Sequence, residues 1–146
     1  MHQTVKKNSI LALAAGALVI IVVTTLVDVL LHFVGVYPPM DQPINDNLAL
    51  LATSYRIVIG VAGAWLTARL APSGPMKHAM ILGAIGTVLG LVGVIATWNR
   101  SLGPRWYPIS HVVLALPECW LGGKLCLMRP AYAGRGQPSD DTKRVA

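Results

Sequence analysis

The stretch from Ser9 to Val36 reads SILALAAGALVIIVVTTLVDVLLHFVGV, and it decides the fold class. It contains no Lys or Arg, and it carries a single acidic residue, Asp28, and a single histidine, His32. A helix needs about 20 predominantly apolar residues to cross the hydrocarbon core of a bilayer, so this stretch is long enough. Three later windows have the same character. We therefore predict an all-α polytopic membrane protein, a four-transmembrane-helix bundle within residues 1–129, with spans at about 9–36, 48–71, 76–97 and 107–128.

The composition also favours a membrane protein. Of the 146 residues, 54% are hydrophobic and 12% are charged, whereas soluble domains carry about 25% charged residues. The four windows and their short connections leave no room for a second domain. Residues 130–146 combine Gly, Pro, Ser and charged residues, which bury too little apolar surface to fold. We expect this segment to be a disordered cytoplasmic tail.

The basic residues are placed as in a membrane protein with both termini in the cytoplasm. The formal net charge is +6, but we do not infer nucleic-acid binding from it, because Lys and Arg concentrate on the cytoplasmic side of membrane proteins. The first predicted loop, residues 37–47, has no basic residue. We therefore expect both termini in the cytoplasm, on the side that holds nine of the 12 Lys and Arg residues: Lys6, Lys7, Arg69, Lys77, Lys124, Arg129, Arg135, Lys143 and Arg144.

Five ionisable side chains lie inside the predicted spans. Such residues are rare in membranes, usually face the bundle interior, and often carry the function. Helix rise places all five within about 16 Å of the outer end of their span. Because they share one half of the membrane, we take them as one candidate binding site: Asp28, His32, Arg56, His111 and Glu118.

Two features of this set refine the expectation. Asp28 and Arg56 have the same estimated depth, about 12 Å, on consecutive helices, and pairing is how buried charges are tolerated. We predict that they are in contact. Glu118 then has no cationic partner, and a carboxyl in apolar surroundings tends to hold its proton. Pro117 should kink the helix beside Glu118, and the two together predict a polar pocket open towards the outside.

The most favoured function is non-enzymatic: binding, or assembly of a membrane complex, through this pocket. No catalytic motif is present. The alternative is a proton-coupled carrier of a small molecule or ion in which Glu118 cycles its proton. A third interpretation is an electron-transfer subunit with a haem between His32 and His111. A divalent metal held by the acids and histidines is a further alternative, but Arg56 would repel a cation. We expect neither a haem nor a metal. The expected partner is the surrounding lipid bilayer.

The predicted outer loop between the third and fourth spans departs from the charge rule. It reads WNRSLGPRWY and carries Trp98, Arg100, Arg105 and Trp106. These four residues are further binding candidates, because arginine and aromatic side chains together suit an anionic lipid or headgroup. The favoured interpretation is simpler: the arginines pair with Asp41 and Asp46 of the first outer loop.

Small residues recur at 3–4 spacing along the spans and predict packing faces, since small side chains let membrane helices approach closely. The 3–4 spacing places Arg56 and Glu118 on these packing faces, so both side chains should point inward. Gly86 and Gly90 form a GxxxG match, which leaves homodimerisation open as an alternative to packing within the bundle. The stripes are Ala49, Thr53, Arg56, Gly60, Gly63, Thr67, then Ala79, Gly83, Gly86, Gly90, Gly93, Thr97, then His111, Ala115, Glu118, Gly122. Cys119 and Cys126 are too far apart along one helix for a disulfide and are expected in the core.

Several short motifs resemble small bacterial four-span inner-membrane proteins whose function is not assigned. They are TARLAP (67–72), PMKHA (75–79) and LGAIG (82–86), followed by ATWN (96–99), WYP (106–108) and LGGKL (121–125). The resemblance extends over most of the chain outside the tail. It implies a bacterial inner membrane and no particular activity, partner or site residue.

Overall fold

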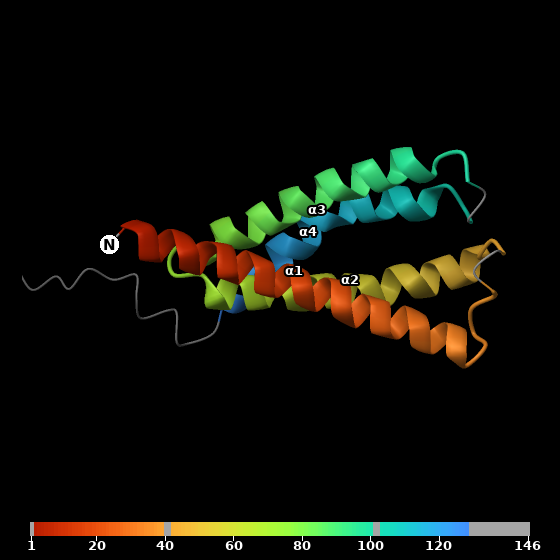
Figure 1. Cartoon of the computed structure of the whole chain (residues 1–146), viewed down its shortest axis with the longest axis horizontal. Helices are drawn as coiled ribbons and strands as arrows, with labels where there is room; N and C mark the ends of the chain where they lie inside the picture. Colours follow the sequence, from red (N-terminus) through yellow and green to blue (C-terminus); the bar gives the residue numbers. More distant parts are fainter. Residues whose placement is uncertain (1, 40–41, 101–102, 129–146) are drawn as a thin grey trace, which may run out of the picture.

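The computed structural model describes residues 2–39, 42–100 and 103–128, with side chains from residue 8 onward. The described residues form four helices: α1 (His2–Phe33), α2 (Asp46–Leu70), α3 (Pro75–Thr97) and α4 (Trp106–Leu127) (Figure 1). The predicted all-α class is confirmed. The tail predicted for residues 130–146 and Asp41 lie outside the described residues.

Three of the helices are long and apolar enough to cross a membrane: Asn8–Phe33, Asp46–Leu70 and Pro75–Thr97. At 22 residues α4 is the shortest, and Glu118 and Lys124 lower its apolar character. The fourth span therefore stays a prediction. Large exposed hydrophobic side chains crowd the outward faces of α1 and α3, for example Leu26, Phe33, Leu89 and Ile95, as expected of helices that face lipid.

The helix ends follow local chemistry. The first helix ends at Phe33, three residues before the predicted boundary, because Gly35 adopts φ 74°. The amides of Gly35 and Val36 bond to the carbonyls of His32 (3.1 Å) and Leu31 (2.9 Å), which is a Schellman motif. Asn45 caps α2 by accepting the Leu48 amide at 2.9 Å. These turns reverse the chain so that successive helices run antiparallel.

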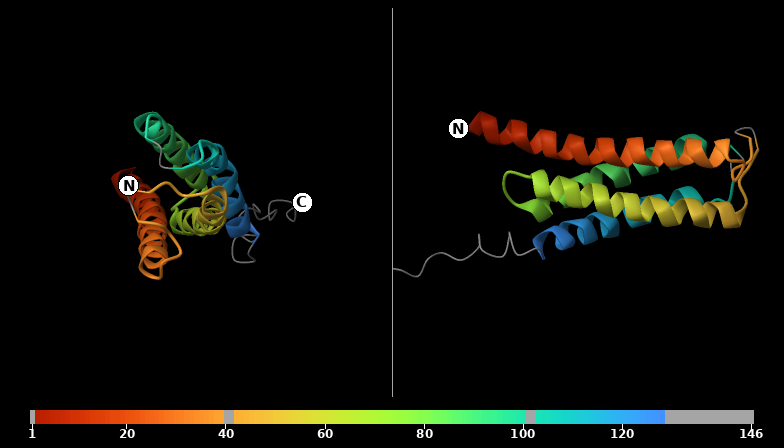
Figure 2. Two further views of the ribbon diagram at one scale, coloured as in Figure 1. Left: turned by 90° about the vertical axis from the view of Figure 1, so that its right-hand side faces the viewer. Right: turned by 90° about the horizontal axis from the view of Figure 1, so that it is seen from below.

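The four helices form two hairpins that are close together at one end and diverge at the other. Figure 1 shows α1–α2 and α3–α4 separating towards their connecting loops, and Figure 2 shows the same helices from two further sides. Besides its hairpin partner α1, α2 packs on both α3 and α4. Among the described residues no Cα atom of α1 lies within 8 Å of a Cα atom of α4. A space between the α1 and α4 backbones is therefore built into the bundle.

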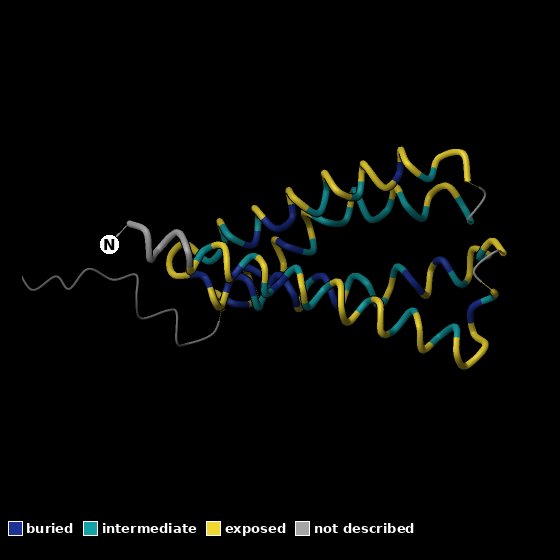
Figure 3. The backbone as a smooth tube through the Cα atoms, in the orientation of Figure 1, coloured by how far each residue is buried: buried dark blue, intermediate teal, exposed yellow. Residues whose placement is uncertain are grey.

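Glycines make the close contacts at the joined end. A Cβ on Gly16 would lie 2.7 Å from the Gly63 carbonyl oxygen, and one on Gly122 would lie 2.5 Å from the Val61 carbonyl oxygen. These distances leave no room for a methyl group, so α2 is approached closely by α1 and by α4. Figure 3 shows the buried residues concentrated at this end. They include two core clusters, Ala64–Leu82–Cys119 and Ala68–Ala79–Cys126, in which both cysteines are free thiols.

The predicted small-residue faces are confirmed for α2 and only in part for α3. Gly60, Gly63 and Thr67 of α2 are buried. On α3, Gly83 is buried, but Gly93 is exposed and a Cβ there would meet nothing within 4 Å. Packing continues on another side of α3, because the neighbouring Val94 is buried and a Cβ on Gly90 would meet Val112 of α4 at 3.2 Å.

Candidate functional site

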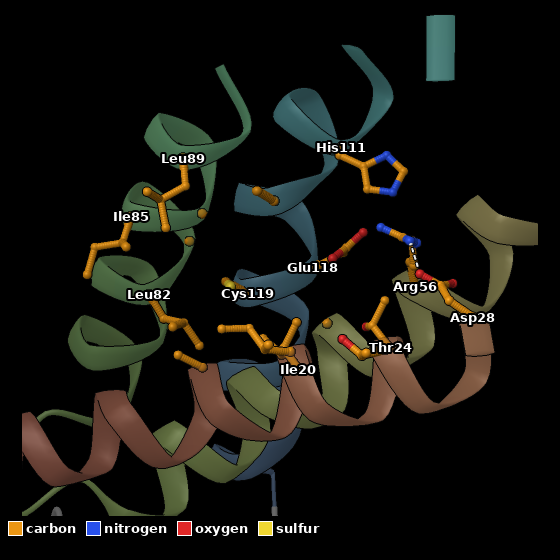
Figure 4. Close-up of a pocket in the computed structure, with 17 residues that line it drawn as sticks. Ile20, Thr24, Asp28, Arg56, Leu82, Ile85, Leu89, His111, Glu118 and Cys119 are labelled. Carbon is orange, nitrogen blue, oxygen red and sulfur yellow. Dashed lines mark hydrogen bonds and ion pairs between the residues drawn. The ribbon is translucent and has the colours of Figure 1, made fainter. Parts of the chain in front are cut away.

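A pocket of ≈ 450 Å³ occupies the space between α1 and α4 and is lined by all four helices (Figure 4). Four of the five predicted site residues line it: Asp28, Arg56, His111 and Glu118. The remaining walls are mostly aliphatic, with Ala17, Ile20, Ile21, Thr24, Thr25, Gly60, Leu82, Gly83, Ile85, Gly86, Leu89, Ala115 and Cys119. The charged groups other than Glu118 gather at the end nearer the hairpin loops, so the pocket is polar at one end and apolar at the other.

Asp28 and Arg56 form an ion pair, which confirms the predicted contact. Arg56 Nη2 lies 2.6 Å from Asp28 Oδ2, and both side chains are roughly 70% shielded from solvent, with exposed fractions of 28% and 30%. The Tyr55 hydroxyl donates to the other Asp28 oxygen, and Tyr37 Oη lies 3.1 Å from Tyr55 Oη. Both carboxylate oxygens of Asp28 are therefore occupied by partners on α2.

The aromatic partners were not among the predicted site residues. Tyr107 on α4 faces the Arg56 guanidinium, whose carbon lies 5.9 Å from the ring centroid, within the range of a cation–π contact. Tyr55 gave one usable signal: it immediately precedes the intramembrane Arg56.

His111 presents a defined hydrogen-bonding face. Its Nδ1 lies 2.9 Å from the Tyr107 carbonyl oxygen. A carbonyl only accepts, so Nδ1 carries the hydrogen and Nε2 of the neutral ring is an acceptor. His111 Nε2 and Arg56 Nε are both enclosed by protein atoms and have no partner among the described residues.

Glu118 lies between the two ends of the pocket, and its carboxyl rests against Gly60. A Cβ at Gly60 would overlap Glu118 Oε2, so the absence of a side chain on α2 creates the niche that holds this carboxyl. In Figure 4 the Glu118 side chain points towards His111 and Arg56. No ion pair or hydrogen bond reaches it from the residues that the structure describes. As predicted, Arg56 and Glu118 face inward.

The pocket opens sideways between α1 and α3, and the predicted opening towards the outer face stays a prediction. Ile21 of α1 and Leu89 of α3 both line it and are exposed, at 63% and 64%. These residues lie on the flanks of two helices that are long enough to cross a membrane. The predicted kink at Pro117 does not make the opening: α4 is one continuous helix through Pro117, which is exposed and does not line the pocket.

His32 lies outside the pocket. Its Nδ1 is 2.8 Å from the Asp28 carbonyl oxygen, and its ring meets the Tyr37 ring edge-on at 5.2 Å. His32 and His111 therefore do not face a shared cavity in which a haem would be ligated by both. Within the described ranges, no three His, Cys, Asp or Glu side chains converge as a metal site would require.

Comparison with protein families, curated proteins and solved structures gives no match. The resemblance to bacterial four-span proteins accordingly stays a prediction, and so do the bacterial inner membrane and the direction of the termini. Functional inference depends on the pocket itself.

The outer-loop residues surround a second, smaller cavity of ≈ 230 Å³, which Trp98, Arg100 and Arg105 help to line. The Arg105 guanidinium carbon lies 5.5 Å from the Trp98 ring centroid. Trp106 Nε1 donates to Asp46 Oδ1 at 2.7 Å. The expected pairing of the arginines with Asp46 is wrong: in the described part of the chain Asp46 bonds to Trp106 and no ion pair joins it to either arginine.

Proposed function

We propose that this chain is a small four-span protein of the bacterial inner membrane, with both termini cytoplasmic, that binds a membrane-dissolved amphiphile in the pocket between α1 and α4. The proposed activity is binding and not catalysis. One observation carries it: a pocket of ≈ 450 Å³ with aliphatic walls, a charged end and exposed lining residues on α1 and α3. A ligand with an apolar body and a polar head matches both ends.

The sideways mouth supports entry from the bilayer and not from water. Of the four exposed residues that line it, three are aliphatic (Ile21, Ile85 and Leu89) and one, Thr25, carries a hydroxyl. A molecule already dissolved in lipid reaches the charged end without leaving an apolar environment. Binding of this kind also suits a subunit that presents or shields a ligand within a larger membrane complex or a homodimer.

The test fills the pocket. Gly86 lines it, and a Cβ at Gly86 meets only the Ala115 methyl at 3.6 Å, so a leucine there fits the backbone and projects into the pocket. Gly93 lies seven residues later on the same helix, is exposed, and is the matched control. The purified protein is incubated with decanol, decanoate and decylamine, and retained ligand is counted by native mass spectrometry.

We expect the wild type and Gly93→Leu to retain one of these amphiphiles per chain and Gly86→Leu to retain none. Equal retention of every probe by all three proteins would place the binding outside the pocket and refute the proposal.

A proton-coupled carrier is the second candidate, and the unpaired Glu118 carboxyl facing the pocket favours it. In proteoliposomes, a pH gradient should then drive uptake of the retained amphiphile by the wild type and not by Glu118→Gln. Uptake that is independent of the gradient would eliminate the carrier and leave the binding function in place.

A further inference from the structure

The charges at the polar end of the pocket identify what kind of head group would fit. Arg56 is neutralised by Asp28 at 2.6 Å, and Asp28 has its second oxygen occupied by Tyr55. This pair contributes no net charge to an incoming molecule. Arg56 Nε and His111 Nε2 have no partner, but both are enclosed by protein atoms and out of reach.

The Glu118 carboxyl is the group that remains. It lines the pocket, and its oxygens are not enclosed by protein atoms, unlike Arg56 Nε and His111 Nε2. The described residues offer it neither a cation nor a hydrogen-bond donor. Gly60 holds the space it occupies, since any side chain there would displace it. The pocket thus presents one ionisable acceptor to its occupant, about 10 Å deeper along α4 than His111.

On this basis, and given the proposed binding function, we propose that the ligand is a lipophilic amine whose nitrogen binds the Glu118 carboxyl while its apolar body lies between α1 and α3. An amine in its neutral form takes the proton of the protonated Glu118 carboxyl. The products are a carboxylate and an ammonium ion held together by charge-assisted hydrogen bonds. No net charge enters the site, so entry from the bilayer carries no cost for moving an ion through hydrocarbon.

The alternatives are disfavoured by the same contacts. A fatty acid would bring a second carboxylate to a site where Arg56, the one cation among the described lining residues, is already paired with Asp28. An alcohol would donate a single neutral hydrogen bond and leave Glu118 un-ionised. Charge-assisted hydrogen bonds are roughly twice as strong as neutral ones, so the amine is the best fit.

The probes are decylamine, decanol and decanoate, which share one tail and differ only in the head group. Competition in native mass spectrometry should rank decylamine first for the wild type. Glu118→Gln keeps the size of the side chain but cannot form the ion pair. It should therefore weaken the binding of decylamine by about ten- to a hundredfold and leave the binding of decanol unchanged. Control variant Gly93→Leu should behave as the wild type.

Infrared spectroscopy of the wild type provides a second readout that needs no folded variant. The C=O stretch of a protonated carboxyl should disappear when decylamine binds and persist when decanol binds. Retention of decanol or decanoate at least as tight as decylamine, or a persistent C=O band with bound decylamine, would overturn the amine assignment while leaving the pocket as a binding site. If the wild type and Gly86→Leu retained all three probes equally, the binding function itself would be overturned.

Discussion

Breaking the Asp28–Arg56 pair should destabilise the bundle in an asymmetric way. Arg56→Ala leaves Asp28 with the Tyr55 hydroxyl as a donor. Asp28→Ala leaves Arg56 with the face of Tyr107 and no counter-ion, and also removes the acceptor of the Tyr55 hydroxyl. We therefore expect Asp28→Ala to lower the free energy of unfolding more than Arg56→Ala.

The magnitude follows from the burial of the pair. Removing one partner of a fully buried ion pair costs about 3–5 kcal/mol, whereas exposed pairs contribute about 0–1 kcal/mol. With 28% and 30% of the two side chains exposed, we expect a coupling energy of about 2–4 kcal/mol between Asp28 and Arg56. The double variant, which leaves neither charge behind, should be more stable than Asp28→Ala alone.

The assay is reversible unfolding in mixed micelles of a non-ionic detergent and SDS, followed by circular dichroism for the wild type, both single variants and the double variant. Asp46→Ala and Arg100→Ala form the matched control cycle, because neither of these charged residues forms an ion pair within the described ranges. The control cycle should be additive. If the Asp28–Arg56 cycle is additive to within about 0.5 kcal/mol as well, the ion pair does not stabilise the protein and the reasoning is refuted.

Three further predictions concern packing, protonation and orientation. Gly122→Ala should prevent stable folding, because its Cβ would lie 2.5 Å from the Val61 carbonyl oxygen. Gly60→Ala should fold but lose amine binding, because its Cβ displaces the flexible end of Glu118. Equal melting midpoints for the two variants would contradict this. At neutral pH the infrared difference between wild type and Glu118→Gln should contain the C=O stretch of a protonated carboxyl, and a carboxylate band alone would show that Glu118 is ionised in a triad with Asp28 and Arg56. A C-terminal alkaline phosphatase fusion should be inactive, and an active fusion would reverse the proposed orientation.

Most of the fold follows from local sequence properties. Long apolar runs predict the helices, and equal depth on consecutive helices predicted the Asp28–Arg56 contact, because a charge in lipid has few ways to be neutralised. The end of α1 was misplaced by three residues because Gly35 sits within an apolar run and its turn-forming role is hidden there. Length and composition do not establish α4 as a fourth span, because Glu118 and Lys124 lower its apolar character.

The site itself was predicted less completely, for reasons of geometry. Whether the pocket opens to the side or to the outer face depends on how far apart α1 and α4 are, and no residue pattern encodes that distance. The contact of Gly60 with the Glu118 carboxyl depends on the rotation of α2 against α4. His32, placed at the site by depth alone, bonds back to the Asp28 carbonyl one turn earlier and does not reach the pocket.

The size of the pocket bears on what occupies it in a membrane. An unfilled apolar cavity costs roughly 24 cal/mol per Å³, so leaving the aliphatic part of the ≈ 450 Å³ pocket empty would be unfavourable. In the proposed arrangement the mouth faces the bilayer, and a lipid chain entering sideways between Ile21 and Leu89 would remove this cost. A specific ligand must then displace a lipid chain that fits the apolar walls equally well. Tail contacts alone cannot select it, and selectivity must come from the head group at Glu118.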